Sequence, residues 1–346
     1  MRFRELIFGA IATALLAGYL VAGARFYATV GPVQAATPTP TLARETNVPA
    51  PRVPGTIAFT ARGEVFVMRD GTYRTQTSEG RSQQPALSSD GRQLLFVRIE
   101  NIDGRRISDG LTVPARLGYS SVIVKPSGGG TETTLVDGLR QRAANGFHQV
   151  SWYLSPSLSP DGKRLAFLED DGGGAADLVV MDLATKRRTV ISNGADLADA
   201  TWSSDGKSIA TTSYAADPAG ITMWNPDRPG IPARVKLPAS TDGYRPSFSP
   251  DGRWLAYTQR HDERNDLHLF EIATSRDVAL TDDGRSWNAV FSPDGRWIAF
   301  DREKGGVVDL YAMELGDVLT GGAAKDAVKL TRGEGVDGAS RPAWGN

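Results

Sequence analysis

The sequence predicts an all-β protein built from a repeated unit of four short strands, and three observations support this prediction. A turn of the type Ser-Pro-Asp-Gly or Ser-Ser-Asp-Gly recurs five times, with its aspartate at Asp90, Asp161, Asp205, Asp251 and Asp294. Each turn lies between two short apolar runs, of which the second is typified by Leu165-Ala-Phe-Leu168. Two more strand-like segments follow before the next turn. Four short strands in a unit of about 45 residues predict the blade of a β-propeller.

The turn sequence favours a tight hairpin between the first two strands. Proline presets φ at the first central position, aspartate tolerates the second, and glycine takes the left-handed conformation that closes the hairpin. The third and fourth strands of a unit are expected at segments such as Leu178–Asp182 and Thr189–Ile191. The aromatic residues that end the first strand should pack between blades; they are Trp202, Phe248, Phe291 and Trp344.

The two ends of the repeat region predict the number of blades. Residues 56–59, 64–68 and 73–76 match the second to fourth strands of a unit that lacks its first strand. Residues 341–344 match a first strand that lacks the other three. Joined together they complete a sixth blade, and the C-terminal strand would pair with the N-terminal blade and remove the exposed sheet edges. We therefore expect residues 54–346 to form a six-bladed propeller.

These Ser-Pro-Asp-Gly turns, each followed by a Leu-Ala-Phe run, resemble the TolB-like propeller repeat, also named the WD40-like or PD40 repeat. The resemblance covers nearly all of the chain after residue 54. TolB itself carries an α/β domain before its propeller, where this chain has a linker, so we do not expect a Tol–Pal role. The same repeat forms the propeller of prolyl oligopeptidase-like enzymes, whose hydrolase domain this sequence lacks.

The amino terminus predicts a signal peptide or a transmembrane anchor over residues 1–35. Arg2 and Arg4 precede an uncharged run from Leu6 to Ala24, which is just long enough for a membrane helix of about 20 residues. Small-residue cleavage sites end at Ala24 and at Ala35. Residues 36–53 follow as a Pro/Thr-rich linker, which reads as an extended spacer. Residues 54–346 are therefore expected outside the cytoplasm, either membrane-anchored or periplasmic or secreted.

Composition narrows the classes of function. The net charge is −1, so nothing in the charge balance favours nucleic acid as a partner. The chain has no cysteine and three histidines, which excludes disulfides, thiolate nucleophiles and Cys-ligated metals. No catalytic motif is recognisable. We expect no cofactor, and neither the His261/His268 loop nor the acidic run from Glu169 favours a metal site over solvated side chains.

A candidate binding site follows from aligning the six first strands. The residue at the start of each is polar, and two of these residues are preceded by an aromatic side chain. The resulting channel-mouth set is Gln84, Ser155, Asp199, Tyr244, Arg245, Trp287, Asn288 and Arg341. Two arginines against one aspartate would favour an anionic group, and the aromatic side chains would serve as anchors on the rim. The alternative is that these groups only hydrogen-bond one another and channel water.

Propeller geometry would place this mouth on the face that carries the connections between blades. Two insertions, residues 99–119 and 137–152, belong to the same face and could mark the binding side. They could equally be neutral surface decoration. A longer loop at residues 316–325 would lie on the opposite face.

Two functions are compatible with these features. We favour a non-catalytic extracytoplasmic binding or scaffold module that recognises a protein, a peptide or a cell-envelope glycan at the channel mouth. The alternatives are an envelope hydrolase or lyase with its active site at the same mouth, or the partner subunit of a separate peptidase.

Overall fold

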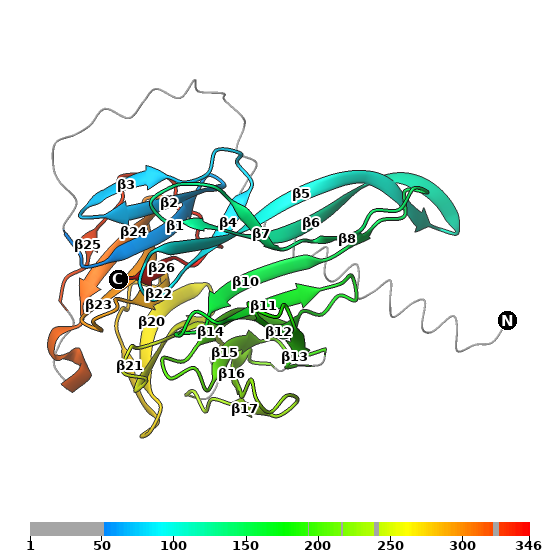
Figure 1. Ribbon diagram of the computed structural model, residues 1–346. Coiled ribbons are helices and arrows are strands. Elements are labelled where there is room, and N and C mark those ends of the chain that lie inside the picture. Colours follow the sequence, from blue (N-terminus) through cyan, green and yellow to red (C-terminus); the bar gives the residue numbers. More distant parts are fainter. Residues whose placement is uncertain (1–51, 193, 216, 239–241, 321–324) are drawn as a thin grey trace. The chain divides into compact units, whose positions relative to one another are not determined.

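The computed structural model describes residues 52–192, 194–215, 217–238, 242–320 and 325–346, which all belong to one compact unit (Figure 1). The expected signal or anchor segment and nearly all of the linker lie outside the described residues. Among the residues that the structure describes, no helix combines the length and hydropathy needed to cross a bilayer.

The described residues confirm the all-β class, because strands are joined by turns and the one helix is the short 3-10 helix η1 (Gly316–Thr320). The strands form six four-stranded antiparallel sheets and one two-stranded sheet. The first two sheets are β26 (Ala343–Gly345), β1 (Thr56–Ala61), β2 (Glu64–Arg69) and β3 (Thr72–Thr75), then β4 (Ser82–Leu87), β5 (Gln93–Ser108), β6 (Leu111–Pro126) and β7 (Thr133–Val136). The next two are β10 (Trp152–Leu158), β11 (Arg164–Asp170), β12 (Asp177–Asp182) and β13 (Arg188–Val190), then β14 (Leu197–Trp202), β15 (Ile209–Ser213), β16 (Gly220–Trp224) and β17 (Pro232–Arg234). The last two are β18 (Asp242–Phe248), β19 (Trp254–His261), β20 (Arg264–Glu271) and β21 (Arg276–Ala279), then β22 (Ser286–Phe291), β23 (Trp297–Lys304), β24 (Val307–Glu314) and β25 (Val328–Lys329). The two-stranded sheet pairs β8 (Leu139–Gln141) with β9 (Gln149–Val150).

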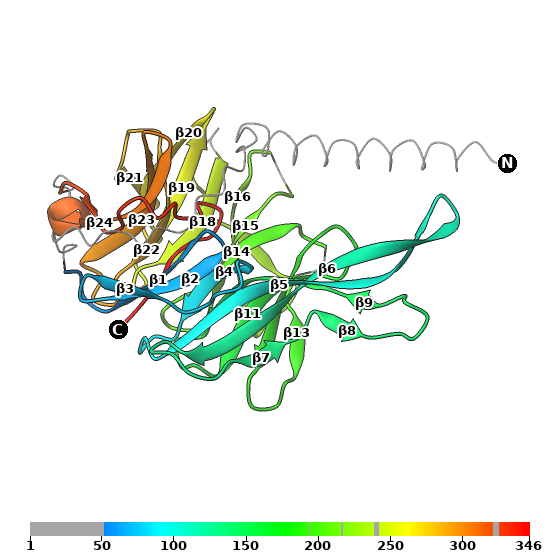
Figure 2. The same ribbon diagram turned by 90° about the horizontal axis from the view of Figure 1, so that it is seen from above.

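The first strands of the six sheets lie next to one another in the order β26, β4, β10, β14, β18 and β22, and β22 in turn contacts β26. These six strands therefore surround a common axis, and the other three strands of each sheet follow outward (Figures 1 and 2). In the first sheet the C-terminal strand β26 pairs with β1, with Thr56 opposite Gly345 and Ile57 opposite Trp344.

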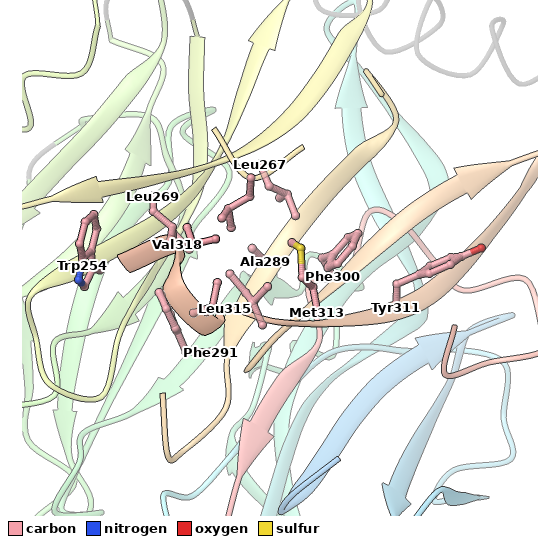
Figure 3. Close-up of a cluster of buried hydrophobic side chains, with 13 residues drawn as sticks. Trp254, Leu267, Leu269, Ala289, Phe291, Phe300, Tyr311, Met313, Leu315 and Val318 are labelled. Carbon is pink, nitrogen blue, oxygen red and sulfur yellow. The ribbon is translucent and has the colours of Figure 1, made fainter. Parts of the chain in front are cut away.

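The Leu-Ala-Phe runs form the second strand of each sheet, and their pattern follows from being covered on both sides. Alternate side chains of a strand point to opposite faces of the sheet. Ile298 and Phe300 of β23 accordingly pack into one hydrophobic cluster with the fifth sheet, whereas Ala299 packs into another with the first sheet. Figure 3 shows the first of these clusters, to which Leu315 and Val318 also belong.

The Ser-Pro-Asp-Gly turns have the predicted geometry. In the third sheet the amide of Gly162 donates to the carbonyl of Ser159 at 2.8 Å, and Gly162 adopts a φ of +68°. The aspartate is turn chemistry, as expected, because Asp161 Oδ1 accepts from Ser159 Oγ at 2.6 Å and from the Lys163 amide at 3.1 Å. The same two bonds recur at Asp90, Asp205, Asp251 and Asp294.

The two insertions of the second sheet contain strands. Residues 99–119, expected as an insertion between the second and third strands, extend β5 and β6 to 16 residues each, and these two strands stay in register to their ends. Residues 137–152 contain β8 and β9. The loop expected at residues 316–325 begins with η1, whose Val318 side chain is buried in the core.

Candidate functional site

Five of the six residues at the start of the first strands share an unusual backbone conformation. Their φ angles lie between 49° and 63°, a region that residues other than glycine rarely adopt. At each of them the pairing between the first and second strands shifts register, so each residue sits in a β-bulge. These residues are Gln84, Ser155, Asp199, Arg245 and Asn288. The structure therefore brings the predicted ring residues to equivalent positions, in a strained conformation that the sequence did not reveal.

The bulges release backbone amides from the sheet, and side chains of the preceding blade accept them. The amide of Ser155 donates to Oε1 of Gln84 at 2.7 Å. The amide of Asp199 donates in the same way to Oγ of Ser155 at 3.2 Å. The carboxylate of Asp199 then accepts from Thr212 Oγ1 at 2.8 Å. Buried amides need such partners, so these ring side chains link one blade to the next.

The other three bulge amides donate to hydroxyl groups of residues outside the predicted channel-mouth set. The amide of Arg245 donates to Thr212 Oγ1 at 2.9 Å, and the amide of Asn288 donates to Thr258 Oγ1 at 3.2 Å. The amide of Gln84 donates to Ser340 Oγ at 2.7 Å. All five bulge amides are thus satisfied by the neighbouring blade.

A short segment, residues 336–340, lies against the ring, and we call it the mouth strap. The carbonyl of Gly338 in this strap accepts three hydrogen bonds, from Arg245 Nη1 at 2.7 Å, Trp287 Nε1 at 2.9 Å and Asn288 Nδ2 at 2.9 Å. A Cβ atom at position 338 would lie 2.8 Å from the Trp287 ring. Glycine is therefore required for this close approach. Trp287 serves here to hold the strap, in addition to any role on the rim.

The Asn288 amide that binds the mouth strap also binds a buried carboxyl group, that of Asp301. Asp301 and Asn288 are both 0% exposed, and Asn288 Nδ2 also donates to Asp301 Oδ2 at 2.6 Å. The other carboxyl oxygen of Asp301 has no hydrogen-bond partner in the described structure. Burial raises the pKa of Asp301 to about 8, against the opposing effects of the Asn288 amide and the Arg245 guanidinium. Asp301 is therefore largely protonated at neutral pH.

Arg341, just before β26, reaches backbone carbonyls of the fourth and fifth sheets. Its guanidinium donates to the carbonyl of Ala200 at 3.2 Å and to that of Pro246. Burial lowers the pKa of Arg341, and the carboxylate of Asp199 opposes this effect. Two of its five N–H donors are used in this way. Arg341 borders a small cavity of about 30 Å³ on the ring side and a larger one of about 420 Å³ on the other side.

The larger cavity, which we call the turn-face chamber, is lined by the C-terminal halves of the first strands and by residues of the Ser-Pro-Asp-Gly and Ser-Ser-Asp-Gly turns of five sheets. Its wall contains six prolines and the four aromatic residues that end the first strands. Arg341 is the one charged side chain among these described lining residues. The prolines are Pro85, Pro156, Pro160, Pro250, Pro293 and Pro342, and the aromatic residues are Trp202, Phe248, Phe291 and Trp344. Seven serine and threonine residues also line the chamber, so its wall is mixed in polarity, and its volume lies within the range of about 300–1,000 Å³ that is typical of ligand pockets.

The predicted site residues are therefore close together but mostly engaged with one another. Tyr244 donates through its hydroxyl to Asp242 Oδ2 at 2.7 Å, and its ring lies 6.0 Å from that of Tyr214. Arg245 Nη1 donates to Asn288 Oδ1 and to the Gly338 carbonyl of the mouth strap. The turn-face chamber was missed by the sequence analysis, which assigned its aromatic residues only to the core. No group of three or more His, Asp or Glu suited to a metal ion occurs in the described part of the chain.

No protein-family model matches this chain. It is 31% identical over 123 residues to the protein TolB homolog of Chlorobium luteolum, a match that covers 36% of this chain and 27% of that protein. It is 27% identical over 207 residues to the protein TolB homolog of Chlorobium chlorochromatii, covering 58% and 42%. The matched part spans less than half the length of either relative.

A solved structure of similar fold is that of TolB from Acinetobacter baumannii. The TM-score is 0.63 at 22% identity, over 84% of this chain and 66% of that chain. This likeness concerns the fold. Together with the sequence matches it confirms the resemblance to TolB-like propellers that the turns predict.

Proposed function

We propose that residues 54–346, which are similar to TolB-like β-propellers, form a closed six-bladed propeller that binds a protein or peptide outside the cytoplasm. The pairing of β26 with β1 and the ring of first strands support the blade number and the closure. The basic, apolar amino terminus supports the location. Catalysis is not part of the proposal, and an envelope glycan is the alternative ligand.

The turn-face chamber is the observation that carries this function. Its volume of about 420 Å³ suits a segment of a few residues rather than a whole domain. Proline and aromatic walls favour apolar and aromatic ligand groups, and the serine hydroxyls supply polar contacts for backbone groups. Three donors of Arg341 remain for an acceptor on the ligand.

The channel mouth that the sequence predicts, which we call the ring mouth, is the second candidate site in this proposal. Its cavity of about 30 Å³ is bordered by Gln84, Ser155, Asp199, Ala339 and Arg341. That volume holds about one water molecule. A ligand at this mouth would therefore contact the rim, where Tyr214 is 47% exposed, rather than enter the channel.

Three tryptophan variants distinguish the two mouths. Ser204→Trp places an indole at the rim of the turn-face chamber, and Ala339→Trp places one at the ring mouth; both positions are exposed. Thr189→Trp, on the outer strand β13, is the control. Each variant of the full chain, carrying an affinity tag, is incubated with solubilised envelope proteins, and the retained proteins are compared with those of the parent.

We expect Ser204→Trp to abolish retention of the ligand while the other two variants retain it. Loss only in Ala339→Trp would move the site to the ring mouth. Equal retention by all four proteins would reject the channel as the binding site. Thermal unfolding of each variant checks that the fold is intact.

A further inference from the structure

The paired strands β5 and β6 project from the second sheet as a two-stranded arm, which we define as residues 99–120. The neighbouring strands β4 and β7 pair with β5 and β6 only on the sheet side, up to Arg98 and from Val122. Beyond these residues only β5 and β6 pair with each other, and Figures 1 and 2 show them extending away from the sheets. An isolated ribbon is marginally stable in water, so the arm needs support.

That support comes from the segment that contains β8 and β9. The amide of Arg105 donates to the carbonyl of Gly146 at 2.8 Å. His148 Nε2 donates to the carbonyl of Asp103 at 3.2 Å, while its Nδ1 accepts from the Ala143 amide at 3.0 Å. Hydrogen bonds thus join the two insertions of this sheet into one structure.

The end of the arm is apolar and exposed. Ile107 is 69% exposed and Leu111 is 67% exposed, and Phe147 of the supporting segment is 37% exposed. These are three of the seven exposed large hydrophobic residues found in the described part of the chain. The turn between the strands is Asp109-Gly110, with φ angles of 53° and 76°. Both angles are positive, as in the tight turns that favour Asp-Gly, so Asp109 has a structural reason to be there.

Arginines surround this apolar end without partners. Arg105, Arg106, Arg116 and Arg142 are exposed, and none of the four has an ion pair in the structure as described. Elsewhere arginines of the same sheet are paired, as Arg98 is with Glu132 at 2.8 Å. Against these four arginines stand three carboxylates of the arm, Glu100, Asp103 and Asp109, which leaves a net charge of +1. The remainder of residues 54–346 is acidic overall.

We propose that this arm docks on an anionic lipid bilayer. Exposed aliphatic side chains beside unpaired arginines match the interfacial region of a membrane, where apolar groups enter the acyl boundary and cations meet the headgroups. The chain outside the structure favours this occupant over a soluble protein. The uncharged amino-terminal run from Leu6 to Ala24 is expected to be a membrane anchor or an export signal, and as an anchor it would tether residues 54–346 to a lipid surface.

The experiment uses the absence of cysteine from the chain. Thr112→Cys, in the full chain, carries an environment-sensitive NBD label beside Leu111 and leaves both apolar side chains of the arm in place. Thr189→Cys on β13 is the matched control, because this threonine is also exposed on a strand. Each protein is reconstituted in vesicles of phosphatidylcholine alone or with 30% phosphatidylglycerol, with and without brominated acyl chains.

We expect the label at position 112 to brighten and to be quenched by brominated lipid only in vesicles that contain phosphatidylglycerol. Arg105→Glu with Arg106→Glu should shift the bound fraction of the arm about ten-fold or more toward the free state, since each basic residue near such a surface contributes about a factor of five. Asp109→Asn should shift it toward the bound state. A label at position 112 that behaves like the label at position 189 in every vesicle would overturn the proposal. An equal response in phosphatidylcholine alone would overturn the role of the arginines.

Discussion

Asn288 donates to both the carbonyl of Gly338 and the carboxyl group of Asp301, at 2.9 Å and 2.6 Å, without exposing any of its own surface. One amide group therefore connects the mouth strap to a buried acid. The acid has its pKa raised to about 8, chiefly by burial. The closure of the ring mouth is thus linked to a titratable group.

Asp301 should make the stability of the propeller fall as the pH rises from about 4 to 8. Its ordinary pKa of 3.8 holds in the unfolded chain, and the folded pKa is about 8. In this window the folded protein therefore binds one more proton than the unfolded chain, so its stabilising contribution is complete below pH 4 and is lost as the pH passes 8. The loss is on the order of 5 kcal/mol.

Asp301→Asn removes this titration and keeps an oxygen for the Asn288 amide. We expect urea unfolding of the variant to give nearly the same free energy at pH 5 and at pH 8, whereas the parent loses stability between them. Parallel pH profiles for the two proteins would show that Asp301 does not titrate in this window.

Two turn glycines should respond differently to alanine. Gly91 and Gly162 have φ angles of 65° and 68°, so both substitutions introduce left-handed strain of about 1–2 kcal/mol. A Cβ atom at Gly91 would in addition lie 1.9 Å from the carbonyl oxygen of Asn346, whereas nothing lies within 4 Å at Gly162. Urea unfolding should therefore show a larger loss for Gly91→Ala than for Gly162→Ala. Equal losses would mean that the C-terminal residue does not lie against this turn.

Deletion of residues 341–346 should destabilise the domain by more than the loss of Trp344 alone. It removes the pairing of β26 with β1 and the guanidinium that joins Ala200 to Pro246. Truncation of a large aromatic core residue costs about 3–5 kcal/mol, and Trp344→Ala should fall at or below this range because its ring is partly exposed. Thermal unfolding shows whether the deletion lowers the melting temperature more than Trp344→Ala does, relative to the parent. A deletion that melts with the parent would contradict the closure.

Arg245→Ala should destabilise the folded state by about 1–3 kcal/mol, because Gly338 loses a charged donor in a partly buried site. Removing this guanidinium also removes an effect that lowers the folded-state pKa of Asp301, so the pH-dependent loss of stability should extend to a higher pH. Arg92→Ala is the control, since the Arg92 side chain is 86% exposed. Urea unfolding at pH 6 compares the free energies of unfolding of Arg245→Ala, Arg92→Ala and the parent. Equal stability of the two variants would show that Arg245 is free to serve a ligand, as the sequence predicts.

The repeat could be read from the sequence because its turns and its apolar runs are both local patterns. Ser-Pro-Asp-Gly specifies a hairpin through φ preferences, and Leu-Ala-Phe reflects a strand covered on both sides. The hydrogen bonds that link neighbouring blades at the ring could also have been predicted in part. Thr60, Thr212, Thr258 and Asp301 occupy one aligned position, directly after the Leu-Ala-Phe run, where other blades carry Val97 or Leu168. A polar residue at a core position signals a buried hydrogen bond.

Other features leave no such signal. The carbonyl of Gly338 accepts three hydrogen bonds. Every residue has a backbone carbonyl, so the sequence does not mark this one as an acceptor. The turn-face chamber depends on how the six first strands diverge, so its aromatic side chains could be assigned to the core but not to a wall. Residues 99–108 of the arm are mostly polar and show no strict apolar/polar alternation, a pattern that favours a loop over a strand.

The direct pairing of Thr56 with Gly345 places the two ends of the folded region on adjacent strands. The blade at which the chain starts is then independent of the cyclic order of the blades around the axis. Joining residue 346 to residue 54 and opening the chain at another turn, such as Asp205-Gly206, would give a circular permutant with the same set of strand pairs. In such a permutant the tether of the amino terminus would leave from a different blade, so the orientation in which the propeller is presented could be changed without altering its channel.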